Sequence, residues 1–218
     1  MSTTSGKVFI VDDDDAVRNS LRMLFKTVDI DSVTFESGDA FLHEYDADWH
    51  GCIVLDIRMP GTSGLEVQKV LAERANTLPI IFITGHGDVP MAVEAMQLGA
   101  FDFVQKPFGD QELVDRVSQA MAQNEELQES VLHKRKVLNC YKDLTPREKE
   151  VMHCVVKGQA NKVIAMDLDV SQRTVEIHRA RVMEKMQARS LAALVRKSML
   201  LDDQNPDVVA DEHCDEDQ

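Results

Sequence analysis

The sequence lacks the apolar run that a membrane-spanning helix needs, because no stretch approaches about 18 consecutive apolar residues. The segment Met1–Lys7 is polar and acids follow it after only four apolar residues, so no signal peptide is expected. The four cysteines are scattered and form no CxxC pair, which argues against a zinc site or a disulfide framework. We therefore expect reduced thiols and a cytoplasmic location.

Basic residues are also scarce, since 24 Lys and Arg stand against 38 Asp and Glu, for a net charge of −14. Such a chain is at first sight a poor partner for nucleic acid, but its charge is unevenly distributed. Residues 143–200 hold 11 basic and 7 acidic side chains, whereas residues 201–218 hold no basic and 8 acidic ones. A basic segment is thus followed by an acidic, apolar-poor tail over 202–218, which we expect to be disordered and solvated.

The first 122 residues alternate between short apolar runs, typical of buried strands, and helical patterns. Five runs predict strands: Val8–Val11, Ser32–Phe35, Cys52–Leu55, Ile80–Ile83 and Phe101–Val104. Strands that alternate with helices predict an α/β domain, residues 1–122, with a five-stranded, doubly wound parallel sheet. Ligands of such sheets bind at the carboxyl ends of the strands.

From Asp110 onwards, seam residues recur at spacings of four and three, through Asn124 and Lys134 to Leu138. This is a heptad-like pattern with polar residues at two seam positions. Up to about residue 122 the pattern favours an amphipathic helix packed on the sheet. Over residues 123–142 it predicts a helical linker, and a dimeric coiled coil remains an open alternative.

A second, all-helical domain is predicted over residues 143–201. Thr145 is a typical N-cap, Pro146 suits the first helical position, and Glu148 lies three residues after the cap. These residues form a capping-box signature at the start of the domain. Breaks farther along the segment, at Gly158 and around Asp169, predict four short helices.

Two of these helices predict a helix-turn-helix unit, with a tight turn at Asp169-Val170 and Ser171 as the cap of the second helix. Three residues of the second helix form its predicted buried stripe: Val175, Val182 and Met186. Its predicted outward-facing residues are Arg173, Glu176, Ile177, Ala180, Arg181 and Lys185. A helix with arginines on its outer face suits the major groove of DNA, where phosphate contacts supply much of the affinity. The alternative is that this helix is an ordinary amphipathic surface helix that does not bind DNA.

Polar side chains follow four of the predicted strands, namely Asp12 and Asp13, Asp56, Thr84 and Lys106. They should converge on one edge of the sheet. Three carboxylates held close together need a cation, and hard oxygen ligands suit Mg²⁺. A metal, a lysine and a hydroxyl around one carboxylate are typical of phosphoryl transfer, in which the carboxylate forms an aspartyl phosphate.

Other sites for such a cluster fit less well. An EF-hand loop that starts at Asp12 needs Gly and Glu where Val17 and Met23 stand. A phosphatase of the haloacid-dehalogenase type uses a second Asp two residues after the nucleophile, but position 58 is Arg. A purely structural cluster does not explain why Asp56, Thr84 and Lys106 each end an apolar strand.

The stretches VDDDDAVRNSL, VLDIRMPGTSGLE and FITGHGDVPMAVEAMQLGAFDFVQKPF together resemble a response-regulator receiver domain over about residues 5–122. The resemblance implies that Asp56 is the phosphoacceptor and that Thr84 and Lys106 bind the phosphoryl group. It also implies a Mg²⁺ site formed by Asp12, Asp13, Asp56 and the backbone carbonyl of Arg58. Thr84 and Phe103 would form a conformational switch. Arg58 and His86 would flank the phosphorylation site, and the Lys106-Pro107 bond is often cis in this family.

The stretches LTPREKEV, GQANKVIA, SQRTVEIH and MEKM resemble the LuxR-type DNA-binding domain over Leu144–Leu200. The resemblance places Glu176, Ile177 and Ala180 at positions of base contact. It places five others at positions that contact phosphate or support the fold, namely Lys162, Arg173, Thr174, His178 and Lys185. The complete set of predicted DNA-binding residues is Asn161, Lys162, Arg173, Thr174, Glu176, Ile177, His178, Ala180, Arg181 and Lys185. Glu176 has an equal alternative, an intrahelical ion pair with Arg173 or Arg179. The last helix, Ser190–Leu200, matches the dimerisation helix of that family, or simply closes the core.

A receiver followed by a LuxR-type domain is typical of the FixJ/NarL class, and the sequence is nearer the FixJ branch. The predicted function is that of a phosphorylation-activated transcriptional regulator. A sensor histidine kinase would phosphorylate Asp56 with Mg²⁺ present, and the chain would dimerise through residues 90–98 and 101–104 and bind promoter DNA. Apart from its own phosphorylation and dephosphorylation, the chain is not expected to be an enzyme. The basic domain argues against an output through protein binding alone.

Overall fold

The computed structural model describes residues 6–85 and 89–202. The chain divides into two compact units, Met1–Gln128 and Glu129–Gln218. The predictions for the leader segment before residue 6, for His86 and for the acidic tail fall wholly or mostly outside the described residues. Among the helices that are described, none combines the length and the apolar character that crossing a membrane requires.

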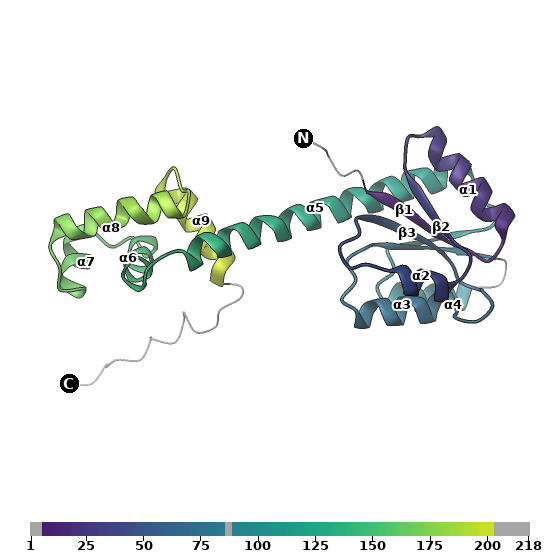
Figure 1. Cartoon of the computed structure of the whole chain (residues 1–218), viewed down its shortest axis with the longest axis horizontal. Coiled ribbons are helices and arrows are strands. Elements are labelled where there is room, and N and C mark those ends of the chain that lie inside the picture. The colour runs from purple at the N-terminus through teal and green to yellow at the C-terminus, as the bar shows by residue number, and fades with distance from the viewer. Residues whose placement is uncertain (1–5, 86–88, 203–218) are drawn as a thin grey trace. The chain divides into compact units, whose positions relative to one another are not determined.

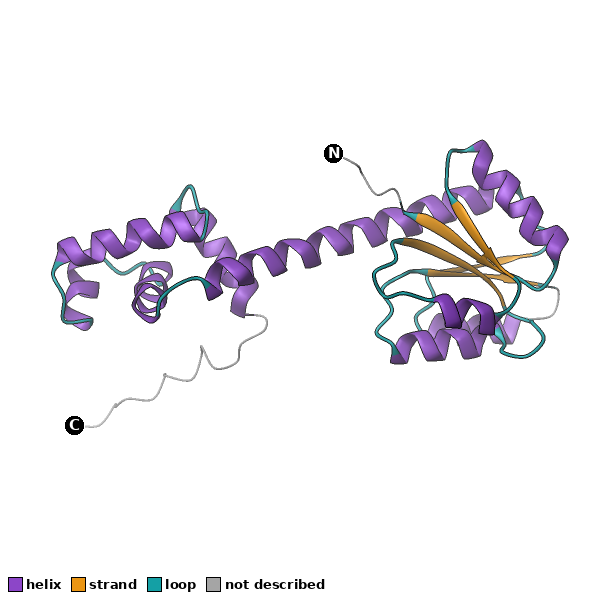
Figure 2. Cartoon of the chain, in the orientation of Figure 1, coloured by secondary structure: helices purple, strands orange, loops and turns teal. Residues whose placement is uncertain are grey.

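A five-stranded parallel sheet forms the centre of the first unit (Figure 2). Its strands run in the order β2-β1-β3-β4-β5, which confirms the predicted doubly wound fold. The strands are β1 (Lys7–Val11), β2 (Ser32–Phe35), β3 (Gly51–Asp56), β4 (Ile80–Thr84) and β5 (Asp102–Gln105). The last strand is shifted by one residue from its prediction, because its start and end follow its pairing with β4, from Ile81↔Asp102 to Thr84↔Gln105.

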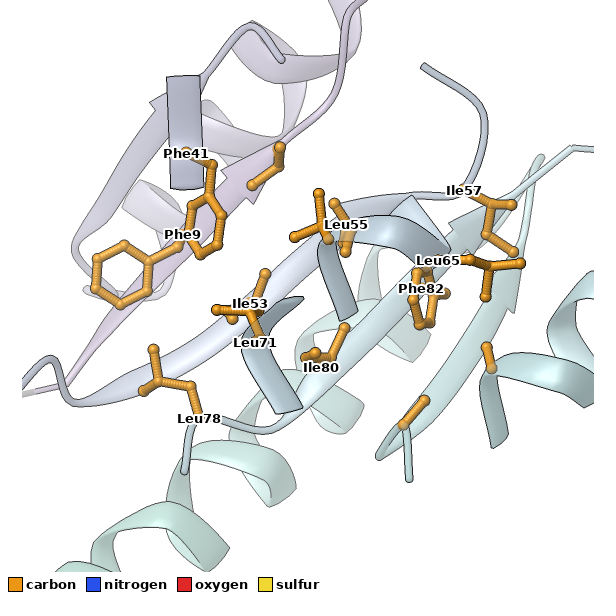
Figure 3. Packing of buried hydrophobic residues seen from close by; sticks show 14 of the residues in the cluster. Phe9, Phe41, Ile53, Leu55, Ile57, Leu65, Leu71, Leu78, Ile80 and Phe82 are labelled. Carbon is orange, nitrogen blue, oxygen red and sulfur yellow. The ribbon is translucent and has the colours of Figure 1, made fainter. Parts of the chain in front are cut away.

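Helices cover both faces of this sheet (Figure 1). One face carries α1 (Asp15–Thr27) and the first part of α5 (Asp110–Lys142), and the other carries α2 (Gly38–Glu44), α3 (Gly64–Glu73) and α4 (Val89–Gln97). Alternate strand residues point to opposite faces. Val8 and Ile10 therefore pack with α1 and α5. Phe9 packs on the opposite face with residues of α2 and α3, in the cluster that Figure 3 shows. Helix α2 was not identified individually from the sequence.

Helix α5 is one continuous helix over the segment predicted as sheet-packed helix and linker. Its packing on the sheet reaches Asn124, a buried residue that fills a polar position of the heptad-like seam. Asn124 Oδ1 accepts from Gly51 N at 3.0 Å, and its Nδ2 donates to Thr77 O at 2.9 Å. Both halves of the amide are therefore satisfied, as a buried polar group requires. Leu127 and Val131, farther along the seam, are exposed, and the coiled coil remains a prediction.

The second unit contains four short helices in its described part, as the sequence predicted. They are α6 (Pro146–Val156), α7 (Asn161–Asp167), α8 (Gln172–Lys185) and α9 (Leu191–Asp202). The capping box is confirmed, because Thr145 Oγ1 accepts from Glu148 N while Glu148 Oε2 accepts from Thr145 N. The predicted stripe on α8, formed by Val175, Val182 and Met186, lies in the core of this unit.

Glu148 links two helices of this core. Besides closing the capping box, its buried carboxylate accepts from Lys185 Nζ of α8 at 2.6 Å. The hydrogen bond from Lys185 and the backbone hydrogen bond from Thr145 lower the pKa of Glu148 from its usual 4.5 to about 2. The ionised carboxylate therefore fastens the end of α8 to the start of α6.

We predict that acid weakens the second unit through Glu148. Because its folded pKa lies below its unfolded value, the stabilisation is complete above pH 4.5 and is lost as the pH falls towards 2. Glu148→Gln should lose about 1–3 kcal/mol at pH 7, since Lys185 loses its charged acceptor. It should lose less stability than the wild type between pH 5 and pH 3. Hydrogen exchange of α8 amides measures both effects.

The matched control is Glu184→Gln, which removes an exposed carboxylate from α8 itself. That variant should exchange as the wild type does at both pH values. Equal pH dependence of the wild type and Glu148→Gln would show that this carboxylate does not couple stability to pH.

Candidate functional site

The carboxyl edge of the sheet gathers two carboxylates around one ammonium group. Asp12 directly follows β1, Asp56 ends β3, and Lys106 directly follows β5. Lys106 Nζ donates to Asp12 Oδ2 at 2.9 Å and to Asp56 Oδ1 at 2.8 Å. Both aspartates are buried and the lysine side chain is partly exposed. The parallel sheet therefore joins residues that are 94 and 50 positions apart in the chain.

The second oxygen of Asp56 accepts from the backbone N–H of Arg58 at 2.7 Å. Burial raises the pKa of Asp56 above its usual value, against the opposing effects of Lys106 and of the Arg58 N–H. Burial lowers the pKa of Lys106, but the hydrogen bonds to Asp56 and Asp12 outweigh it and raise that pKa overall. Lys106 is thus held as a fixed cation beside a carboxylate that water hydrates poorly.

Other predicted residues lie along the same edge. Thr84 is buried at the end of β4, and its hydroxyl donates to Gly85 O at 3.2 Å rather than to Asp56. Phe103 lies on the neighbouring strand β5, paired with Phe82, and is exposed. The Lys106-Pro107 peptide bond is cis.

The four consecutive aspartates divide into separate roles. Asp12 is buried and bound to Lys106, whereas Asp13 is exposed. Asp14 is the N-cap of α1, with its Oδ1 accepting from Ala16 N at 2.8 Å, and Asp15 lies in the first helical turn. Negative charge there complements the free N–H groups of the helix start. The repulsion between like charges is thus relieved by Lys106 on one side and by α1 on the other.

The residues of the expected cation site can be compared with the ligands that Mg²⁺ requires. Among the described residues, no group of three or more His, Cys, Asp or Glu lies close enough together to hold a metal. Asp13 therefore does not join Asp12 and Asp56 in a compact trio. Mg²⁺ does not need one, because it commonly takes one or two carboxylates and fills its other positions with water and phosphate oxygens. An exposed Asp13 next to the Asp12–Asp56–Lys106 cluster fits that demand.

Sequence reasoning missed two residues that shape this edge. Arg18 of α1 donates to the backbone carbonyls of Asp12 and Asp13 at 2.7 and 2.9 Å. Gly64 starts α3 so close to β3 that a Cβ would lie 2.3 Å from the carbonyl oxygen of Asp56. Both stand within the motifs VDDDDAVRNSL and VLDIRMPGTSGLE. Only the spatial contacts reveal what they do.

The second unit presents the predicted helix-turn-helix. Helices α7 and α8 are joined through a turn in which Asp169 has a φ of 51°, and the Ser171 hydroxyl accepts from Thr174 N at 3.1 Å. Ile164 of α7 and Val175 of α8 pack in one core. The buried face of α8 therefore fixes which of its side chains point outward.

The ten predicted DNA-binding residues fall into two groups. The exposed group is Lys162, Arg173, Glu176, Ile177, Ala180 and Arg181. On α8 these recur every three or four residues and so share one face. The others are partly buried: Asn161, Thr174, His178 and Lys185.

Three of the four partly buried residues make contacts within the unit. Asn161 Oδ1 accepts from Arg179 at 2.8 Å, Thr174 belongs to the Ser171 cap, and Lys185 pairs with Glu148. The contact of Lys185 with Glu148 agrees with a supporting role, and a phosphate contact of Lys185 stays a prediction. In the described chain Glu176 makes no ion pair with Arg173 or Arg179. This observation favours the first of its two predicted roles, a contact with a base.

Two family models match the chain. Residues 8–118 match the response regulator receiver domain, and residues 142–198 match the luxR family of bacterial regulatory proteins. The chain is 43% identical to the transcriptional regulatory protein FixJ of Bradyrhizobium diazoefficiens over 197 residues, covering 90% of this chain and 96% of that protein. It is 46% identical to FixJ of Azorhizobium caulinodans over 193 residues, covering 88% and 92%.

Solved structures agree with these matches. The response regulator StyR is 40% identical, with a TM-score of 0.84 over 90% of this chain and 99% of that one. Full-length FixJ from B. japonicum is 41% identical, with a TM-score of 0.57 over 93% and 100%. The chain therefore belongs to the FixJ/NarL type of two-component response regulators, phosphorylation-dependent transcriptional regulators that join a receiver domain to a LuxR-type DNA-binding domain.

Proposed function

We propose that Asp56 is the residue that a sensor histidine kinase phosphorylates and that α8 reads the target DNA. The carrying observation is the single ammonium group of Lys106 that binds both Asp12 and Asp56 at the carboxyl edge of the sheet. A fixed cation beside a poorly hydrated carboxylate suits a site that receives a highly charged phosphoryl group.

In the proposed reaction, a carboxylate oxygen of Asp56 attacks the phosphorus of a phosphohistidine on the kinase. The new O–P bond forms as the P–N bond breaks, and its electron pair returns to the imidazole nitrogen. Lys106, already 2.8 Å from Asp56, pairs with an oxygen of the transferred group. Attack by water on the aspartyl phosphate reverses the modification. These self-directed steps are the only catalysis assigned to the chain.

Asp13, Asp56 and the backbone carbonyl of Arg58 would hold Mg²⁺, with Asp12 beside them. When bound, this ion neutralises charge on the phosphoryl oxygens. Asp12 keeps Lys106 in place through its Oδ2, which is 2.9 Å from Nζ. Its burial makes it a positioning residue more than a direct metal ligand.

The signal would pass from this edge to the face formed by α4 and β5. Thr84 and Phe103 lie on adjacent strands, and a Thr84 hydroxyl drawn to the phosphoryl group would let Phe103 change its orientation. The same face exposes Val93 and Met96, half and two-fifths exposed. A second copy of the chain that covered these side chains would remove apolar surface from water, and this gain would favour dimerisation after phosphorylation.

On the proposed output side, α8 enters the major groove with Arg173, Ile177 and Arg181 on its exposed face. In this proposal, the exposed Glu176 accepts a hydrogen bond from a cytosine amino group. A dimer presents two such helices to a two-fold symmetric site and gains affinity from their linkage. Because promoter DNA is the proposed target, we also propose a cytoplasmic location.

Genome-wide capture of DNA fragments by the full-length protein, with and without acetyl phosphate, tests this function. We expect acetyl phosphate to enrich promoter fragments with two half-sites about one helical turn apart. Capture that is identical in both conditions would contradict control by phosphorylation. Failure to enrich any sequence would contradict the role of α8.

A further inference from the structure

Arg18 forms a clamp on the backbone of the loop between β1 and α1. Its Nη1 donates to the carbonyl oxygen of Asp12 at 2.7 Å and to that of Asp13 at 2.9 Å. Its Nη2 donates to Asp15 Oδ1 at 3.2 Å. The side chain is only 14% exposed, so most of it is shielded from water.

The clamp acts on the two peptide groups that flank the Cα atom of Asp13. Two carbonyl oxygens that share one Nη1 cannot rotate independently, which restricts the backbone angles of Asp13. Asp12 Oδ1 adds a further restraint by accepting from Asp14 N at 2.9 Å. The backbone of the acidic loop is thus held, while the Asp13 carboxylate stays exposed.

The charged guanidinium of Arg18 donates mainly to backbone carbonyls. An arginine this close to a row of aspartates would normally pair with their carboxylates. In the described chain, Arg18 pairs with the carboxylate of Asp15 but contacts Asp12 and Asp13 through their backbone carbonyls. It therefore leaves the Asp13 carboxylate available to a cation, although its positive charge lies nearby.

From this geometry we infer that Arg18 is a positioning residue for the divalent cation. By fixing the backbone at Asp13, it sets the place and direction of that carboxylate before the cation arrives. The cation gains affinity because the loop does not have to be ordered on binding. This inference rests on the proposed Mg²⁺ site and assigns it a residue that does not touch the ion.

Two opposite contributions of Arg18 can be separated by substitution. Arg18→Gln removes both the charge and the fork of donors, whereas Arg18→Lys keeps the charge but loses the planar fork. If positioning dominates, both variants weaken binding of Mg²⁺. If charge dominates, Arg18→Gln tightens binding and Arg18→Lys leaves it unchanged.

The experiment is a calorimetric titration of the full-length, unphosphorylated protein with MgCl₂ at constant ionic strength. We expect Arg18→Gln and Arg18→Lys each to raise the dissociation constant about tenfold, as loss of a second layer around a metal commonly does. Arg22→Gln is the matched control on the same helix. Arg22 is exposed and donates to Asn19 Oδ1 at 2.9 Å, so its loss should change the constant less than twofold.

Asp13→Ala provides the reference for a lost ligand, and circular dichroism checks that each variant is folded. Unchanged or tighter binding by Arg18→Lys, or an equal effect of Arg22→Gln, would overturn the role of Arg18 while leaving the cation site intact. Wild-type affinity in Asp13→Ala would contradict the proposed site itself. Should Arg18→Gln fail to fold, Arg18→Lys still decides, because it retains the charge and most of the side-chain volume.

Discussion

Replacing Asp56 by Asn is expected to reduce phosphoryl incorporation from acetyl phosphate to background. The carboxamide retains an oxygen that can accept from the Arg58 N–H, which lies 2.7 Å from the native carboxylate. It lacks the negative charge that makes a carboxylate oxygen nucleophilic towards phosphorus. The fold should persist, because burial disfavours the native charge and Lys106 keeps Asp12 as a partner. Intact-protein mass spectrometry with Mg²⁺ present measures the added phosphoryl group.

The control for this substitution is Asp14→Asn, the same acid-to-amide change within the acidic run. Asp14 caps α1, and Asn is an equally good N-cap, so this variant should be labelled as the wild type is. Peptide mapping should place the label on β3. Labelling of Asp56→Asn to the wild-type extent would move the phosphoacceptor to another residue.

Arg181→Ala is expected to weaken binding to a captured promoter fragment about tenfold and to lower the salt dependence of that binding. Each phosphate contact that is lost should reduce the slope of log affinity against log salt by about 0.9. Arg181 is exposed on the same face of α8 as Arg173 and Ile177. Lys162→Ala, at the start of α7, should behave similarly. Fluorescence anisotropy at several salt concentrations gives both quantities.

Arg135→Ala serves as the comparison, because it removes the same charge from an exposed position of α5 rather than from α7 or α8. Its affinity and slope should remain within twofold of the wild type. If Arg181→Ala and Lys162→Ala also bind as the wild type does, the placement of α8 in the groove is wrong. If all three variants lose DNA affinity to the same extent, binding depends on the overall charge of the chain and not on a specific face of the second unit.

Local patterns were sufficient for most of the elements, although α2 was not identified individually. The runs Ser32–Phe35 and Ile80–Ile83 are short and rich in β-branched and aromatic residues, which favours strands, and they form β2 and most of β4. The capping box at Thr145 and Glu148 depends on residues three positions apart, so it too can be read from the chain. Strand ends were less accurate because they depend on the register with a neighbouring strand.

The candidate site was predictable to the extent that strand ends converge. Asp12, Asp56 and Lys106 meet because the strand order brings the carboxyl ends of β1, β3 and β5 to one edge. The contact partners of each side chain were not predictable. Lys185 was predicted to face outward and either to contact phosphate or to support the fold, and its bond of 2.6 Å to Glu148 depends on how α8 packs against α6.

The sequence by itself determined the strand and helix segments, the separation of acidic from basic regions and the types of residue at the sheet edge, because these depend on neighbours along the chain. Only the tertiary structure decided which of four consecutive aspartates is buried, which one caps α1 and which carbonyls Arg18 holds. The physical reason is that burial and hydrogen-bond geometry are set by groups far away in sequence, such as Lys106. Four identical residues in a row thus acquire different surroundings and different roles.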